Sequence, residues 1–580
     1  MRVLIQGQGA SRGLALGRAL VRRPHALDTS EQRIDGDQVE SELDRLDRAL
    51  NDARDELHQL RDRLHGVIAQ EFGEFLDLHA LILDDPELRQ GIESLVRDGR
   101  YSAEYALRLQ RDRLASVFEA MDDPYFRSRR EDLDHVIGRV QTALHQQQVR
   151  VPREASGEIL VVHSISPAEL AQAQGQGVVA VVADTGSLLS HSAILARSLH
   201  LPLVFAGGEA LRRIADGDVL MLDGSTGELV IEPSRADLRR YREGQREQGR
   251  ERRRLGRLRH APSVTRDGHR IALLANAEST EDVGQARRLG AAGVGLYRTE
   301  FLFLSRSEPP GEDEQFETYR DVVLAMDGRP VTLRTLDIGA DKAEGSGLML
   351  AQEPNPALGL RGIRLSLANT ALFRTQLRAI LRAAEYGPVR ILLPMVSRRE
   401  ELVDSRRALA EAARSLHEAG HAPGRMPPLG AMIEVPAAAL TLDQLRDQLD
   451  FVAVGTNDLI QYLLAADRNH PGLDDHYSPL HPALIQLLAR VIHIGRGSAL
   501  EVSVCGEIAA DPALTPLLLA LGLETFSLHP ATLLEVREAL SHCDRARLRG
   551  RLRGLLASRD QAQIERWLEK ARRDGIAPAQ

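Results

Sequence analysis

Cysteine and tryptophan are scarce in this sequence, which has two cysteines and one tryptophan among 580 residues. Two cysteines, Cys505 and Cys543, cannot build the disulfide framework of a small secreted domain, so we expect a reducing compartment, the cytoplasm. No apolar run approaches the roughly 18–20 residues that a membrane-spanning helix needs. The first residues, MRVLIQGQGASRG, lack the apolar core of a secretory signal. The composition therefore predicts a cytoplasmic protein without membrane insertion.

Charge of one sign does not dominate either, because 74 Lys and Arg residues face 83 Asp and Glu residues. This mixture argues weakly against a nucleic-acid partner. The strongly basic stretch 235–259 could still bind nucleic acid or form a solvated linker helix. We favour the linker because the stretch lacks the repeated aromatic residues that stack on bases. The length predicts two to four domains.

Residues 1–30 are rich in glycine and in short apolar runs, which indicates strands. Residues 36–145 are charged, poor in glycine and helical in pattern. Their apolar residues recur in steps of three and four, which is typical of the core of a helical bundle. The stripe consists of Leu43, Leu46, Leu50, Ala53, Leu57, Leu60 and Leu64. Strands resume at 157–165, 177–184 and 215–233, so we predict a helical bundle inserted into an α/β domain.

The stretch GSLLSHSAILARSLHLPLV, residues 186–204, carries a histidine between two serines where a strand passes into a helix. Ser190 is a candidate N-cap, which would place His191 in the first helical turn. Free backbone N–H groups and the helix dipole favour negative charge there, so a phosphorylated imidazole would gain more than a neutral one. A histidine that merely packs near the helix is the alternative, and this stretch alone leaves both open.

From residue 269 onward, eight short apolar runs alternate with helical patterns, which predicts a parallel (β/α)8 barrel. The runs are IALLANA, GVGLYRTE, VTLRTLDIG, ILLPMV, LGAMIEV, FVAVGTND, EVSVCGE and TFSLHP. In such a barrel, function lies at the C-terminal ends of the strands. Charged or reactive residues stand at the ends of several of these runs or in the loops that follow them. They are Arg298, Glu300, Arg334, Asp337, Asp341, Arg361, Arg364, Glu434, Asn457, Asp458, Asp467, Arg468, Cys505 and Glu507.

This set of side chains suits a small anion that carries both phosphate and carboxylate. Arginines offer fork-shaped donors to both groups. Glu434 and Asp458 could hold Mg²⁺, which prefers carboxylates, waters and substrate oxygens. The thiol of Cys505 could move a proton. His191, in another domain, is a possible phosphoryl acceptor.

Seven stretches together resemble enzyme I of the bacterial phosphoenolpyruvate:sugar phosphotransferase system, a family of PEP-utilising enzymes. They are SHSAILARSLHLP, GVGLYRTEFLF, RTLDIGADK, NPALGLRGIR, IEVPAAA, GTNDLIQYLLAADR and CGEIAAD. The resemblance implies a multidomain α/β protein: a swivelling phosphohistidine domain with an inserted helical bundle, then the barrel. The bounds we expect are 1–30 with 146–234 for the phosphohistidine domain, 31–145 for the bundle, 235–262 for the linker helix and 263–580 for the barrel.

The resemblance also implies roles for individual residues. His191 matches the phosphorylated histidine, and Cys505 matches the acid that protonates the enolate to release pyruvate. Phosphoenolpyruvate (PEP) would be bound by Arg298, Arg334, Arg361, Asn457, Asp458 and Arg468. Glu434 and Asp458 match the ligands of Mg²⁺. The bundle would dock the phosphocarrier protein HPr or a paralogue, and the barrel would form a homodimer.

Two other functions remain open at this point. A nucleotide-using dikinase or synthase is disfavoured, because no Gly-rich phosphate loop precedes the histidine. The second alternative is a regulator that senses PEP but transfers its phosphoryl group poorly. One observation supports it, a phosphosite sequence that departs from that of the family. Many members read Gly-Gly-x-Thr-Ser-His, whereas this chain has Leu188 and Leu189 ahead of Ser190. Cys505, Arg298 and Arg334 argue against that alternative, since a sensor need not keep a proton donor.

Overall fold

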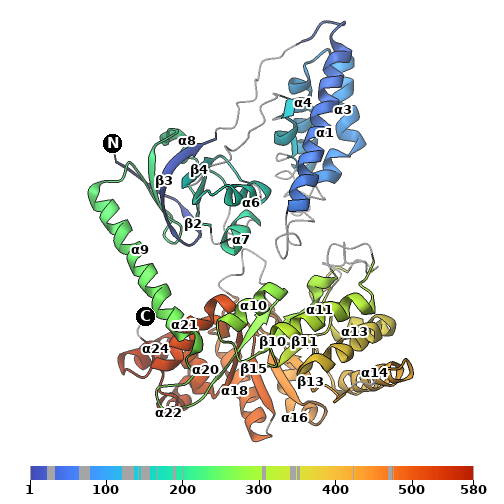
Figure 1. The fold of residues 1–580 in the computed structure, drawn as a ribbon. Coiled ribbons are helices and arrows are strands. Elements are labelled where there is room, and N and C mark those ends of the chain that lie inside the picture. The colour runs from blue at the N-terminus through green and yellow to red at the C-terminus, as the bar shows by residue number, and fades with distance from the viewer. Residues whose placement is uncertain are drawn as a thin grey trace. The chain divides into compact units, whose positions relative to one another are not determined.

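The fold is taken from a computed structural model of the chain (Figure 1), which forms two compact units, residues 1–250 and 251–580. The predicted positions Ser190 and Arg468, with Leu188, Leu189 and Asp341, lie outside the described residues. The structure describes residues 2–22, 33–63, 79–119, 133, 136–141, 143–144, 157–165, 167–186, 191–199, 201–303, 308–339, 348, 353–421, 424–467, 473, 476–498 and 500–578.

The first unit contains a mixed sheet of eight strands in the order β1-β8-β7-β3-β4-β5-β6-β2. Strands β3 to β6 run parallel to one another, and the other pairings are antiparallel. β5 is buried along its whole length, as its apolar, valine-rich sequence predicts. The strands are β1 (Val3–Gln6), β2 (Gln8–Ser11), β3 (Leu14–Val21), β4 (Glu158–Val162), β5 (Ala180–Ala183), β6 (Leu203–Phe205), β7 (Val219–Asp223) and β8 (Glu228–Ile231).

Three helices, α6 (Pro167–Gly175), α7 (His191–Ser198) and α8 (Ala210–Arg213), belong to this α/β part. α7 begins at His191, as predicted, and ends shortly before Pro202. Ser192 fixes its start by donating a hydrogen bond from Oγ to the Ile165 carbonyl at 2.5 Å. Small and apolar residues of α7, Ala193 among them, are buried against the sheet.

The inserted segment forms helices α1 (Val39–Arg63), α3 (Pro86–Arg97) and α4 (Ala103–Glu119) with a core of their own. The predicted stripe packs there from Leu43 to Leu57, which is the part of the stripe whose burial the structure describes. α3 starts as its sequence requires, with Asp85 accepting a hydrogen bond from the Glu87 amide and proline in the first turn. These features confirm a helical bundle within the α/β part.

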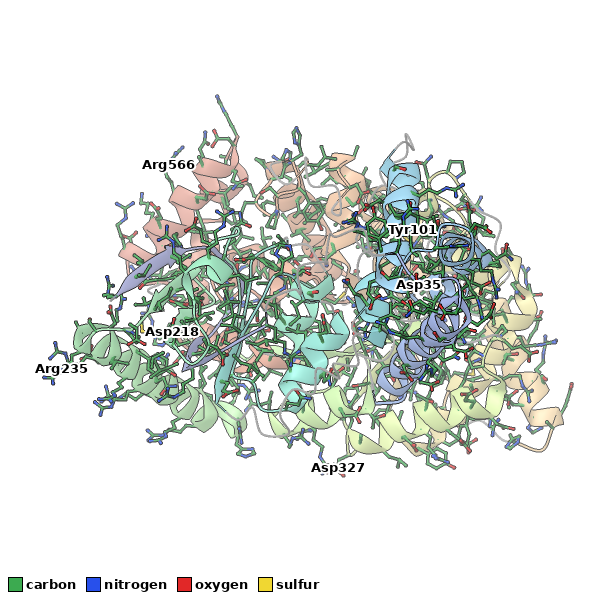
Figure 2. All side chains as sticks on the ribbon, turned by 90° about the horizontal axis from the view of Figure 1, so that it is seen from above. Asp35, Tyr101, Asp218, Arg235, Asp327 and Arg566 are labelled. Carbon is green, nitrogen blue, oxygen red and sulfur yellow. The ribbon has the colours of Figure 1, made fainter. Side chains whose placement is uncertain are left out.

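The basic stretch is one continuous helix, α9 (Arg235–Gly256), followed by the 3₁₀ turn η1 (Arg257–His260). Figure 2 shows nitrogen-tipped side chains extending from α9, beginning at the labelled Arg235. Hydrogen bonds stabilise the first turn of α9, where Asp237 accepts from Arg2 and from Ser234. Among the described residues, no helix combines the length and apolarity needed to cross a membrane.

The second unit is a closed parallel barrel of eight strands, which confirms the predicted (β/α)8 fold. Each predicted run overlaps one strand, with β12 beginning two residues before its run, and each strand pairs with its neighbours in chain order until β16 closes on β9. The strands are β9 (Ala272–Ala277), β10 (Val294–Arg298), β11 (Val331–Arg334), β12 (Val389–Leu393), β13 (Leu429–Ile433), β14 (Phe451–Val454), β15 (Glu501–Val504) and β16 (Thr525–Leu528).

Helices surround these strands (Figure 1). The first of them, α10, carries a capping box in which Ser279 and Asp282 satisfy each other's backbone amides. The helices are α10 (Thr280–Arg288), α11 (Glu312–Ala325), α12 (Ile363–Ala368), α13 (Thr370–Ala383), α14 (Arg399–Glu418), α15 (Pro436–Leu440), α16 (Leu442–Leu445), α17 (Thr456–Leu464), α18 (Pro482–Gly497), α19 (Glu507–Ala510), α20 (Thr515–Leu521), α21 (Leu533–His542), α22 (Arg545–Gly550), α23 (Leu552–Leu556) and α24 (Gln561–Arg573). The four-domain division proposed from the sequence is finer than the two units and stays a prediction.

Candidate active site

The pairing register of the barrel strands places the predicted residues side by side at the C-terminal ends of the strands. Arg298 and Arg334 are the last residues of β10 and β11 and are direct cross-strand partners. Glu434 and Cys505 each follow immediately on a strand, after Ile433 and Val504. Because parallel strands end at the same edge, the C-terminal end of the barrel gathers the charges that the sequence analysis singled out.

Arg334 is the more enclosed of the two arginines, at 7% exposure. It pairs with Glu300, and its Nη1 lies 3.2 Å from Oδ2 of Asp337. Burial alone would lower the pKa of Arg334, but the carboxylates of Glu300, Asp337 and Glu434 raise it above its ordinary value. Its Nε is buried without a hydrogen-bond partner within the described residues. Arg334 is therefore a fixed cation with a donor still to be satisfied.

Asp337 joins Arg334 to Arg361. The Arg361 Nε and Nη2 donate to the two oxygens of Asp337 at 3.1 and 2.9 Å, a bidentate pairing. Gly362, next to Arg361, has a φ of +58°, and a Cβ there would come within 2.8 Å of Met395. Glycine thus lets the loop that carries Arg361 pass close to the strand ends.

Tyr462, on α17, is the other support of Arg361. Its hydroxyl accepts a hydrogen bond from Nη1 of Arg361 at 3.3 Å and donates one to the Ala357 carbonyl at 2.5 Å. Burial raises the pKa of Tyr462 to about 12, although Arg361 opposes this shift. The hydroxyl therefore keeps its proton and its role as a donor at neutral pH.

Glu434 is almost completely buried and accepts a hydrogen bond from the Met395 amide at 2.6 Å. Burial, followed by the charges of Asp337 and Asp458, raises the pKa of Glu434 to about 8. Met395 presents that amide from a left-handed backbone conformation, at a φ of +57°. Carboxyl groups thus crowd a buried position, and a cation bound there would favour the ionised form of Glu434.

Arg298 is paired with Glu278 at 2.5 Å. Burial is the largest cause of a raised pKa for Glu278, and Arg298 partly offsets it. Glu278 directly follows β9, so the strand-end rule that singled out the other charges would also have found it. Arg298 remains more exposed than Arg334, which leaves its guanidinium within reach of a ligand.

Cys505 is a buried thiol in the barrel interior, where it packs with Met432 and Phe451. Its Sγ donates to the Val454 carbonyl at 3.4 Å. Burial, and then the charge of Glu434, raises the pKa of Cys505 to about 12. The thiol is therefore protonated throughout the neutral range and can serve as an acid.

Asn457 lies in the first turn of α17, just after the strand that ends at Val454, and forms two hydrogen bonds with Glu507. Its Nδ2 donates to Oε1 of Glu507, and its Oδ1 accepts from the Glu507 amide, each at 3.2 Å. Gly506 makes this approach possible, because a Cβ there would lie 1.8 Å from the Thr456 hydroxyl. These two hydrogen bonds link Asn457, after β14, to Glu507, after β15.

Among the described residues, no three His, Cys, Asp or Glu side chains gather in a group that could hold a metal ion. Glu434 and Asp458 would therefore supply two ligands and leave the rest to water or substrate. Hard oxygen ligands of this kind fit Mg²⁺, and the mutual repulsion felt by Glu434 is what a divalent cation would cancel.

Comparisons with known proteins cover nearly the whole chain. Residues 252–545 match the family described as "PEP-utilising enzyme, PEP-binding domain". Residues 6–129 match "PEP-utilising enzyme, N-terminal", and residues 154–227 match "PEP-utilising enzyme, mobile domain". A phosphoenolpyruvate-protein phosphotransferase of Cupriavidus necator is 44% identical over 559 residues, covering 94% of this chain and 95% of that protein. Proteins of the same name from Geobacillus stearothermophilus and Bacillus sp. (strain S) are each 38% identical and cover 92% of both chains.

Proposed function

Since the chain belongs to the PEP-utilising enzymes, and within them to the phosphoenolpyruvate-protein phosphotransferases, we propose that it phosphorylates its own His191 from PEP and then phosphorylates a carrier protein. The observation that carries the proposal is the cluster of arginines, carboxylates and one protonated thiol at a single end of the barrel. Phosphoryl transfer needs positioning and charge stabilisation above all, and that cluster offers both.

The arginines would bind the substrate. Arg334 has a buried Nε without a partner in the described part of the chain, and Arg298 is accessible at the same level. Arg361, held in place by Asp337, would contact the phosphoryl group. Asn457 and Asp458 would complete the PEP site, together with Arg468, which lies outside the described residues. These donors stabilise charge on the phosphoryl group and on the enolate that it leaves behind.

Glu434 and Asp458 would hold Mg²⁺. When bound, the ion supplies positive charge that neutralises the phosphate oxygens of the substrate. The chain's own contribution is to fix Glu434 through the Met395 amide and to place Asp458 at the start of α17. Both carboxylates are near the arginines, since Asp458 lies 3.8 Å from Arg361 and the charge of Glu434 acts on Arg334.

His191 would attack the phosphorus in line, forming a P–N bond as the P–O bond of PEP breaks. The enolate that leaves takes a proton on carbon from Cys505, which gives pyruvate. The raised pKa of Cys505 supports this role, because an acid must hold its proton until the enolate forms. At the start of α7, the positive end of the helix dipole would favour the phosphorylated imidazole.

The phosphoryl group would then pass to a histidine of HPr, or of its nitrogen-branch paralogue, docked on the helical bundle within residues 31–145. With HPr as the carrier, this is the first step of sugar uptake and phosphorylation by the phosphotransferase system. The family resemblance supports a homodimer through the barrel. The two free cysteines suit the reducing cytoplasm.

The test is to incubate the purified chain with PEP labelled on phosphorus, with Mg²⁺ and without nucleotide, beside the variant His191→Ala. We expect an acid-labile, base-stable label on the wild type that the variant lacks. Addition of HPr or the paralogue should discharge the label. Absence of label on a wild type that still binds PEP would overturn the proposal and favour a sensor, and labelling that requires ATP would favour a dikinase.

A further inference from the structure

Tyr462 and Asp458 stand four residues apart on α17 and therefore face the same side of that helix. Both approach the same nitrogen, Nη1 of Arg361. The Tyr462 hydroxyl lies 3.3 Å from it, whereas Oδ1 of Asp458 lies 3.8 Å away. At 3.3 Å the contact is a hydrogen bond, whereas 3.8 Å is too long for one.

The rest of the Arg361 guanidinium is already committed. Nε and Nη2 are bound by the two oxygens of Asp337, so that edge of the group is fixed and Nη1 is the nitrogen that reaches Tyr462 and Asp458. Tyr462 is fixed as well, because its own proton goes to the Ala357 carbonyl and its oxygen is left to accept from Arg361. The orientation of Nη1 is therefore set by a choice between a hydroxyl and a carboxylate.

We propose that Tyr462 is a positioning residue that holds Arg361 off Asp458, so that the Asp458 carboxylate stays available to a divalent cation. The inference rests on the proposed roles of Arg361 and Asp458. Without the hydroxyl, Nη1 loses its acceptor, and the nearest alternative is Asp458. The ion pair between Nη1 and Asp458, now 3.8 Å long, would then close to hydrogen-bond distance. That closer pair would have to be broken before a cation could bind, which weakens metal binding without removing any ligand.

The variant Tyr462→Phe tests this in the full-length chain. Mn²⁺, used as a probe for the Mg²⁺ site, is titrated without substrate and its free fraction is read by electron paramagnetic resonance. Loss of one hydrogen bond of ordinary strength predicts Mn²⁺ binding that is about three- to tenfold weaker. In turnover, the KM for PEP should rise at limiting Mg²⁺ and recover at saturating Mg²⁺, with kcat close to that of the wild type.

Tyr319→Phe is the matched control, because it also removes a hydroxyl within the barrel. The Tyr319 hydroxyl is fully buried and bonded to Gln315 and Gln376. Its loss should lower thermal stability and leave the Mn²⁺ affinity unchanged. If Tyr462→Phe behaves in the same way, its hydroxyl is structural and the proposal fails.

The variant Arg361→Met separates action through Arg361 from direct action. In that background, Tyr462→Phe should have no further effect on Mn²⁺ affinity, since the competing cation is gone. An equal loss in both backgrounds would overturn the proposal. Failure of the proposed function is a different result: the wild type would take no phosphoryl group from PEP, whatever the Mn²⁺ titrations show.

Discussion

The two ends of the barrel use buried arginines in opposite ways. At the C-terminal end, Arg334 and Arg361 are paired with carboxylates, and their pKa values are raised above the ordinary value despite burial. At the N-terminal end, Arg537 of α21 donates to the backbone carbonyls of residues 258, 259, 289 and 290 and to the Ser263 hydroxyl. Burial lowers the pKa of Arg537.

The kind of partner distinguishes arginines that could bind a ligand from an arginine that stabilises the fold. Carboxylate partners can be exchanged for the oxygens of a charged ligand, and a donor of Arg334 is still unsatisfied within the described part of the chain. Carbonyl partners belong to the chain, and those of Arg537 lie in the segments that lead into β9 and β10. We therefore expect the C-terminal end of the barrel to bind a charged ligand, whereas Arg537 at the N-terminal end links the segments that precede two strands.

The cysteines give the largest expected contrast between the two ends. Burial raises the pKa of both Cys505 and Cys543 to about 12, but Cys543 lies at the N-terminal end, where its carbonyl accepts from the Arg266 amide. Cys505→Ala should lower the rate of pyruvate formation by about 10²- to 10⁴-fold through loss of the general acid. Cys543→Ala should leave that rate unchanged and cost about 1 kcal/mol of stability. Stopped assays of pyruvate with both variants measure this.

The pH profile gives a control for that contrast. A raised pKa keeps a thiol protonated as pH increases, so Cys505 should retain its proton from pH 7 to well above pH 9. Alkylation of either thiol by iodoacetamide should therefore stay slow over this range. Rapid alkylation of Cys505 near neutral pH, or equal activity of the two alanine variants, would contradict the assignment of Cys505 as the acid.

The arginines give the second contrast. Arg334→Lys keeps the charge but loses the fork of donors, so kcat/KM should fall about 10²-fold while stability changes little. Arg537→Met removes a donor from four carbonyls and should lower the free energy of unfolding by about 3 kcal/mol, with activity per folded enzyme unchanged. Steady-state kinetics and denaturant unfolding on each variant distinguish the two. Equal kinetic losses would show that the two ends are not independent.

The sequence predicted the strand ends because that signal is local. A short apolar run followed at once by Arg298, Glu434 or Cys505 is visible without any tertiary information, and all eight runs overlap strands. Asp337 was found by the same rule, but its pairing with Arg361 was not, and Tyr462 gave no comparable signal. The contact of Asp337 with Arg361 depends on a loop that returns from more than twenty residues away.

Arg537 shows why the N-terminal end could not be predicted. It is one arginine among many on amphipathic helices, and its acceptors are mostly backbone carbonyls, which every residue possesses. Glu278 is a different kind of omission. It stands directly after the first barrel strand and pairs with Arg298, so the rule that found the other charges covers it.

The smallest expected effect is a pH dependence at the N-terminal end. Burial would raise the pKa of Asp267, but the Thr265 hydroxyl and the amides of Ala546 and Arg545 lower it to about 2. A depressed folded pKa stabilises the protein above the unfolded pKa and loses that contribution as pH falls from about 5 toward 2. Because Asp267 is largely exposed, solvent screening limits the contribution to about 1 kcal/mol.

Thermal unfolding of the wild type and of Asp267→Asn, followed from pH 7 down to pH 3, measures this contribution. The difference in melting temperature between the two should be largest near neutral pH and shrink as Asp267 becomes protonated in the wild type. Activity at neutral pH should be the same for both, since Asp267 precedes β9 and lies at the end opposite the catalytic cluster. A difference that grows on acidification would mean that the carboxylate destabilises the fold, and a loss of turnover in Asp267→Asn would mean that the N-terminal end is not purely structural.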